Sequence, residues 1–337
     1  MKRNLVISLF AVALMLLFGA NIFWGSVNIP FQGVLSVLKG DECSEVWRII
    51  VVETRLPQAV TALLAGAAIS VAGLMLQTLF NNLLAGPEVL GISSGAGLGV
   101  AVVMLLAQGT LFVGTLGLYG YLAVLAGAFI GSLAVISLIL FFSSMLRNRL
   151  YLLIVGVAVS FLVSSAISIL NYFATSEGVR SYMVWGMGSF SGVSLYQVPF
   201  FAVPVLLLLV AALSGTKPLN ALLLGDDYAM NLGINVMTAR VLLLATAGLL
   251  VAVVTAFCGP VTFVGLAVPH MARILLKSNN HHYLVPATIM LGGAVALVCN
   301  LVCQLPGESG LLPLGAITPL VGAPVIIYVI IKNRREI

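Results

Sequence analysis

The stretch GPVTFVGLAVPHMAR, residues 259–273, is apolar enough for a membrane and yet contains residue types that could do chemistry. It holds two glycines, two prolines, a histidine and an arginine. Taken alone, it fits three hypotheses. The first is an interrupted membrane helix, the second is a metal or catalytic site built around His270, and the third is a surface for another protein.

Metal or acid–base chemistry at His270 would require further ligands or titratable groups, and the sequence supplies few. The histidines are His270, His281 and His282, without paired carboxylates or an H-E-x-x-H motif. The sequence also lacks a G-x-x-x-x-G-K-[ST] phosphate loop, so any ATP and Mg²⁺ would belong to another subunit. We therefore predict no catalytic residue, metal site or cofactor on this chain, and interpret His270 as a hydrogen-bonding residue at a helix end.

The composition places the chain in a membrane. Hydrophobic residues make up 61% of the 337 residues and charged residues 7%, whereas soluble domains have about 25% charged residues. The net charge of +5 requires no nucleic-acid partner, because membrane proteins concentrate Lys and Arg in cytoplasmic loops. The predicted spans contain essentially no carboxylate, which argues against an ion-coupled secondary carrier or channel, although that alternative stays open.

Ten apolar runs are candidate membrane helices, and we interpret the first as a retained span rather than a signal sequence. They lie near residues 5–24, 58–80, 92–108, 119–146, 150–173, 194–213, 238–257, 261–276, 284–305 and 311–331. With the N-terminus inside, eleven of the fifteen basic residues face the cytoplasm, namely Lys2, Arg3, Arg147, Arg149, Lys217, Arg240, Arg273, Lys277, Lys332, Arg334 and Arg335. The sequence therefore predicts an all-α integral membrane protein, one transmembrane domain over 1–337, with ten spans and both termini in the cytoplasm.

Small residues recur within the predicted spans and allow close helix contacts. They include Gly66, Gly73, Gly91, Gly95 and Gly97, which we expect either to pack helices tightly or to line a moving pathway. GPEVLG (86–91) and GPVTFVG (259–265) both follow Gly/Ala-rich apolar runs that are five spans apart. That spacing predicts an inverted repeat, as in many transporters.

The inner loop 217–240 is the most informative polar stretch. Asn220 is predicted to cap a first short helix that Gly225 ends, and Asp226 a second helix that Gly233 ends. Such a pair of helices is either a protruding docking site for another protein or an amphipathic connector lying on lipid. The acidic residues Asp226 and Asp227 favour docking, because lipid contact favours a basic face.

Four motifs resemble the permease family of iron-siderophore, haem and cobalamin importers, the type II ABC importers. RLPQAVTALLAGAAISVAGLMLQTLFNNLLAGPEVLGISSGAGLG (55–99) resembles that family's motif around its second and third spans. LLGDDYAMNLGI (223–234) resembles its L-G-x-x-x-A-x-x-L-G segment. The stretch at 259–273 resembles its G-P-I-x-F-V-G-L-x-x-P-H-x-x-R motif, and LPLGAITPLVGAPVIIYVI (312–330) resembles its C-terminal motif.

The resemblance implies a bacterial inner-membrane homodimer that imports a metal chelate through its two-fold interface. Ferric siderophore is expected first and haem or cobalamin next, and an oxyanion is also carried by some members. Two cytoplasmic ATPase subunits and an extracytoplasmic solute-binding protein are the implied partners, besides membrane lipid. The loop matching the ATPase-coupling element supplies Asn220, Leu223, Gly225, Asp226, Asp227, Ala229, Leu232 and Gly233.

The resemblance also assigns roles at the two ends of the helices. Pro269, His270 and Arg273 are expected at a cytoplasmic helix end near the ATPase. Arg55 matches an outer arginine that receives a glutamate of the binding protein, and Arg48 and Arg180 could substitute for other docking arginines. Four positions depart from the family. It has a second docking arginine at Gln58, a proline at Leu83 in its inner Asn-Pro pair, and often an acidic residue and an arginine at Asn300 and Gln304.

Overall fold

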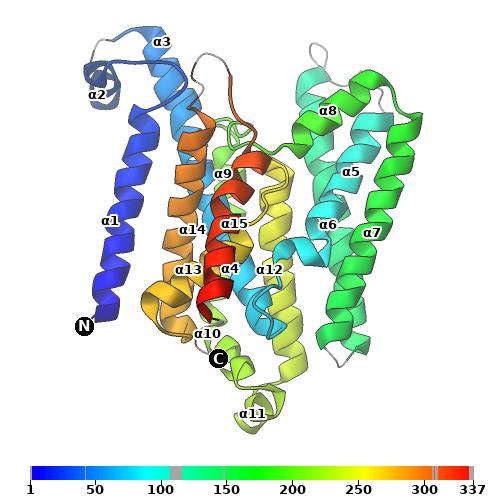
Figure 1. Cartoon of the computed structure of the whole chain (residues 1–337). Helices are drawn as coiled ribbons and strands as arrows, with labels where there is room; N and C mark the ends of the chain where they lie inside the picture. The colour runs from blue at the N-terminus through cyan, green and yellow to red at the C-terminus, as the bar shows by residue number, and fades with distance from the viewer. Residues whose placement is uncertain are drawn as a thin grey trace.

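The computed structural model describes residues 2–41, 43–106, 116–146, 149–305, 307 and 310–333, and the regular elements in these ranges are all helices (Figure 1). Three of the predicted cytoplasmic cations, Arg147, Arg334 and Arg335, lie outside the described residues, as do the last two residues of the 92–108 run. The fold is therefore described from the remaining chain.

Each of the ten predicted apolar runs overlaps a helix. These are α1 (Lys2–Phe23), α4 (Leu56–Leu79), α5 (Ile92–Leu106), α6 (Leu116–Met145), α7 (Arg149–Phe173), α9 (Val198–Ser214), α12 (Val236–Cys258), α13 (Val264–Leu276), α14 (His281–Cys303) and α15 (Leu314–Asn333). Within the described residues, six candidate spans are long and apolar enough to cross a membrane, and α9 joins them if it is counted with α10 (Thr216–Leu223) across a 51° bend. Helices α5, α13 and α15 are shorter and apolar. The protein is an all-helical membrane protein.

Helix α4 is the buried centre of the fold. It continues α3 (Glu45–Arg48) and the π-helical turn η1 (Ile49–Arg55) into one helical stretch of 35 residues, which begins well before the predicted start at residue 58. Nearly every α4 side chain is buried, and α9, α12, α13 and α14 pack around it. A helix that is apolar on all sides is stable in such surroundings because no face needs water.

Glycines bring helix backbones into contact around this centre. A Cβ atom added at three of the predicted glycines would collide with a backbone carbonyl oxygen of the facing helix, so these positions pack helices directly. The pairs are Gly66 with Gly292 of α14, Gly73 with Gly265 of α13, and Gly95 with Gly131 of α6.

The other two predicted glycines have different environments. Gly91 ends the 3₁₀ turn η2 (Pro87–Leu90) with φ of 72°, a conformation that glycine adopts without steric cost. Gly97 is less confined, since a Cβ there would lie 3.3 Å from the hydroxyl of Tyr182. Close packing of helices therefore accounts for Gly66, Gly73 and Gly95 more directly than for these two positions.

Short helices occupy both ends of the bundle (Figure 1). At one end lie α2 (Phe31–Lys39), α3 and α8 (Ser176–Gly186). At the other end lie α10 and α11 (Asp226–Asn231), together with the N-terminal end of the chain and the C-terminal end of α15. The two predicted inner helices are thus on the side that holds both chain ends.

The two inner helices begin differently from the prediction. Helix α10 starts at Thr216, so Asn220 lies within it rather than at its cap. Helix α11 starts at Asp226, but Gly225 occupies the cap position and no side chain caps the helix. Both predicted caps were wrong because these two side chains bind partners elsewhere in the fold: Asn220 bonds to the start of α14, and Asp226 pairs with Arg240 at 3.4 Å.

Gly73→Ala should lower the unfolding free energy by about 1–3 kcal/mol, the usual cost of forcing atoms into a packed interior. The added methyl group would displace the α13 backbone at Gly265. The measurement is the thermal unfolding midpoint of the purified protein in detergent. Gly19→Ala in α1 is the matched control, since nothing lies within 4 Å of its Cβ position; equal midpoints for the two variants would contradict the packing role.

Candidate functional site

The stretch from Gly259 to Arg273 is an interrupted helical passage. Helix α12 ends at Cys258 with Gly259 as its C-cap, and α13 begins after Phe263, whose φ of 64° is uncommon for a residue with a side chain. The break frees the Phe263 N–H from helical bonding, and this N–H donates to Glu88 Oε1 at 2.8 Å. On the other side, Ser189 N–H donates to the carbonyl of Cys258 at 2.8 Å. Protein groups thus satisfy the freed backbone, as a break at membrane depth requires.

The two Gly-Pro motifs meet at this break. Glu88 belongs to GPEVLG and Phe263 to GPVTFVG, so their hydrogen bond joins the two segments that the sequence paired as a repeat. Gly265 packs against Pro87, whose Cδ atom would lie 2.8 Å from a Cβ added at Gly265.

At the other end of α13, His270 and Arg273 bind two different parts of the chain. His270 is buried, and its Nε2 atom lies 3.0 Å from the carbonyl oxygen of Leu83, in the segment that follows α4. Arg273 Nη1 donates to Gln77 Oε1 at 2.5 Å. Gln77 Nε2 in turn donates to the Leu266 carbonyl at 3.2 Å. The two side chains therefore fasten α13 to the end of α4.

A second polar connection joins α10 to the same end of α4. Asn220 Oδ1 accepts from the backbone N–H of His281 at 2.8 Å and lies 2.9 Å from its Nδ1 atom. The opposite ring atom, Nε2, is 2.8 Å from Thr78 Oγ1. Asn220 Nδ2 also donates to Asn280 Oδ1 at 3.1 Å, and Asn280 caps α14. Helix α10 is thereby bonded to α14 and, through His281, to α4.

These bonds form one polar cluster, which we define as Gln77, Thr78, Asn220, Arg273 and His281. Sequence reasoning identified Asn220 and Arg273 as functional candidates and missed the other three. Polar residues late in an apolar span were the available signal for Gln77 and Thr78. His281 gave no local signal, because its partners lie 61 and 203 positions away in the chain.

The inner loop presents apolar side chains beyond this cluster. Leu224, Tyr228, Met230 and Leu232 are exposed, whereas Ala229 is buried and holds α11 against the bundle. Surface cavities of about 770 and 620 Å³ flank the two short helices. Asp226 is tied to Arg240. The other predicted coupling residues are half-buried or exposed: Leu223 and Gly225 are half-buried, and Asp227 and Gly233 are exposed.

The predicted outer arginines fall into two groups. Arg48 and Arg180 are exposed. Arg55 is 4% exposed, and its guanidinium donates to the carbonyl oxygens of Ile22 and Phe23 at 2.9 Å and of Val27 at 2.5 Å. A guanidinium occupied in this way is not presented to a partner, so direct docking at Arg55 does not fit this conformation.

Comparison with known proteins identifies similar chains over almost the full length. The sequence profile of the FecCD transport family matches residues 13–332. The chain is 35% identical over 305 residues to the vitamin B12 import system permease protein BtuC of Escherichia coli O127:H6, covering 90% of each chain. It is 34% identical over 299 residues to the protein of the same name from Salmonella typhimurium strain LT2, covering 89% of each.

A solved structure has the same fold. It is described as an inward-facing conformation of a transporter assigned to the metal-chelate ABC type. The two chains superpose with a TM-score of 0.84 at 26% identity, over 98% of this chain and 99% of the other.

Asn220→Leu should destabilise the junction of α10 and α14, because it removes the acceptor of the His281 backbone and ring donors. Leaving such groups unpaired costs about 1–3 kcal/mol. Asn220→Asp keeps an acceptor oxygen and is the matched control. Hydrogen–deuterium exchange of the peptide that contains His281 should speed up in the leucine variant only; unchanged exchange there would show that the junction does not depend on Asn220.

Proposed function

The chain belongs to the FecCD transport family, and from this premise we propose that it carries a metal chelate into the cytoplasm as the membrane subunit of a type II ABC importer. A permease subunit of this family is a transport component and not an enzyme. Membership also argues against the secondary carrier or channel that the sequence left open. The observation that carries the proposal is the similarity to vitamin B12 permeases over 90% of the chain.

Cobalamin is the substrate that we propose to test first. The sequence alone put ferric siderophore ahead of haem and cobalamin, but the relatives compared above are named for vitamin B12 import. Ferric siderophore and haem follow as related metal chelates, and an oxyanion comes last. An identity of 35% supports a shared substrate class more strongly than a shared substrate.

We propose a ten-span topology, with an inverted repeat and both termini in the cytoplasm. Three observations support it. Each apolar run overlaps a helix, the chain ends lie on the side of α10 and α11, and the two Gly-Pro motifs pack against each other. The whole chain then forms one permease domain, with residues 217–240 as its cytoplasmic coupling loop.

The proposed partners are a second copy of the chain, two ATPase subunits that hold ATP and Mg²⁺, and an extracytoplasmic solute-binding protein. Exposed apolar residues on α11 and directly after α10 and α11 suit burial against an ATPase subunit, since such anchors carry most of the energy of protein interfaces. The polar cluster would then pass movement of α10 to α14, α4 and α13. Arg48 and Arg180 are the exposed cations available to the binding protein.

The test is transport by the whole complex in proteoliposomes. The permease is reconstituted with its ATPase and solute-binding protein, and uptake of labelled cobalamin is compared with uptake of a labelled ferric hydroxamate. We expect uptake that requires ATP in the ATPase-accessible compartment and persists when a protonophore collapses the proton gradient. Uptake that ignores ATP and stops with the protonophore would overturn the proposal.

Met230→Glu should reduce ATP-driven uptake about tenfold or more, because a charge replaces an apolar side chain at the proposed ATPase contact. Asn279→Glu is the matched control, since it adds the same charge at another exposed position on the same side. Uptake and co-purification of the ATPase are measured for both variants. Equal losses in the two variants, or none in either, would argue against the loop as the coupling element.

A further inference from the structure

Three of the positions that depart from the family pattern, all near the outer end of the bundle, lie together. Gln58 is on α4, Asn300 is on α14, and Gln304 directly follows α14. Their side-chain amides form one hydrogen-bonded chain with Asn21 of α1. Asn300 Nδ2 donates to Asn21 Oδ1 at 2.8 Å, Gln58 Nε2 to Asn300 Oδ1 at 3.0 Å, and Gln304 Nε2 to Gln58 Oε1 at 3.4 Å.

The direction of this amide chain is fixed at Asn21. Asn21 Nδ2 donates to the backbone carbonyls of Leu17 at 2.8 Å and Leu297 at 3.2 Å. Carbonyl oxygens only accept, so the Asn21 amide cannot be turned around. Its Oδ1 atom must then accept from Asn300, and the same reasoning fixes Gln58 and Gln304 in turn. The free end of the chain is therefore an acceptor, Gln304 Oε1, which is buried without a hydrogen-bond partner among the described residues.

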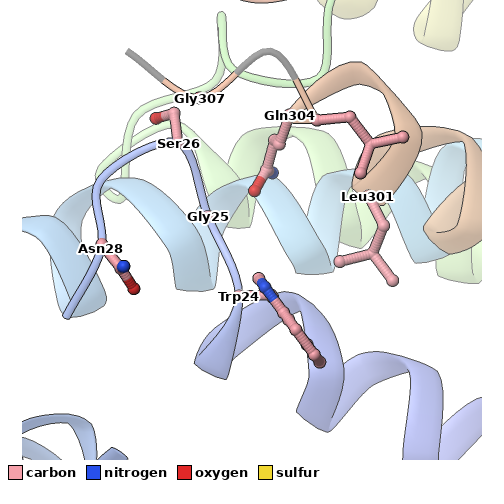
Figure 2. Close-up of a pocket in the computed structure, with 8 residues that line it drawn as sticks. Trp24, Gly25, Ser26, Asn28, Leu301, Gln304 and Gly307 are labelled. Atoms are coloured by element: carbon pink, nitrogen blue, oxygen red, sulfur yellow. The ribbon is translucent and has the colours of Figure 1, made fainter. Parts of the chain in front are cut away.

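Gln304 lies in the wall of a cavity of about 520 Å³ at the end of the bundle where α1 and α14 terminate. Its side chain is 8% exposed, and its amide oxygen points into the space between α14 and the segment after α1 (Figure 2). Trp24, Ser26 and Asn28 line the facing wall, and Leu301 lies beside Gln304. The described residues that line the cavity are uncharged.

Arg55 shapes the facing wall without entering the cavity. Its three hydrogen bonds hold residues 22–27 in place, and its guanidinium packs on Gly25, where a Cβ atom would lie 2.6 Å from Nε. Arg55, which matches a docking arginine of the family, thus binds the backbone at the end of α1 and in the segment after it. Among the described residues, the cavity that it supports offers a buried hydrogen-bond acceptor and no cation.

We propose that this cavity receives a hydrogen-bond-donating side chain, such as an amide, hydroxyl or ammonium group, from the extracytoplasmic solute-binding protein. The inference rests on the proposed function and specifies the chemistry of that partner. A carboxylate, which arginines at these positions would receive, does not fit here because it would face the Gln304 oxygen, and none of the described residues that line the cavity is a cation. A donor, by contrast, satisfies a buried acceptor that otherwise has no partner among the described residues.

The experiment measures binding of the solute-binding protein of the same import system to the permease–ATPase complex in nanodiscs. Gln304→Met removes the acceptor at nearly constant length, and Gln304→Arg installs the family's cation. Both should weaken binding by about tenfold, the size expected for one lost hydrogen bond in a buried site. The loss in Gln304→Met should be the same at low and high salt, because no ion pair is broken.

Gln32→Arg in α2 is the control, since it adds the same charge at an exposed position outside the cavity. Thermal unfolding midpoints show whether each Gln304 variant is folded. If Gln304→Arg is not folded, binding by Gln304→Met alone tests the inference. Unchanged binding in both variants, or tighter binding in Gln304→Arg, would overturn the inference.

A lipid amine is the competing occupant of the cavity, and the nanodisc composition distinguishes it from the binding protein. If the effect of the variants requires phosphatidylethanolamine and vanishes in phosphatidylcholine nanodiscs, a lipid amine occupies the cavity and the inference is wrong. If the wild-type complex binds no solute-binding protein and imports nothing with ATP, the proposed function itself fails.

Discussion

The backbone at the break before α13 must be satisfied by protein, and much of the fold depends on how this is done. Water is not available at membrane depth, so a freed N–H needs a partner from the chain itself. The Glu88 carboxyl supplies it to Phe263. For this to happen, the turn at Pro87 must lie against Gly265, and Gly265 must in turn lie against Gly73 of α4. One hydrogen bond thereby fixes the relative positions of three segments that are far apart in the sequence.

The same arrangement gives α13 two ends with different attachments. Its first residues are held between η2 and α4 by packing of small residues. Its last turns are held by directional bonds, from Arg273 to Gln77 and between His270 and Leu83. Pro269 lies between the two and lacks the N–H that would bond Gly265, which weakens the helix at that point. In the coupling that we propose, a displacement of α10 would pass through Asn220 and His281 to α4 beside these bonds. It would then act on one end of α13 and leave the other end in place.

The sequence predicted the helical class, a helix at each apolar run and the position of the break, because each leaves a local signal in apolar run length, glycine or proline. It failed for contacts made by single polar side chains. Asn220 and Asp226 have the types and positions of helix caps, yet tertiary partners determine their roles. Arg55 matches a docking arginine by motif, but only the structure shows that three carbonyls of the preceding segment occupy its donors. Local pattern cannot decide between such uses, since the partners that compete for these side chains are distant in the sequence.

The amide chain shows why the departures at Gln58, Asn300 and Gln304 are better understood as one change than as three. In a buried network, removing one member of an ion pair leaves an unpaired charge, which is far more costly than replacing the whole set by neutral groups. Amides can replace such a charged network only if each donor meets an acceptor. The carbonyls of Leu17 and Leu297, which accept from Asn21, fix the donor-to-acceptor order of the other amides. The charge that the family places at this end of the permease is thus absent from all three positions together. The amide chain ends in one atom, Gln304 Oε1. The order of the preceding hydrogen bonds determines that this end is the oxygen, and therefore an acceptor.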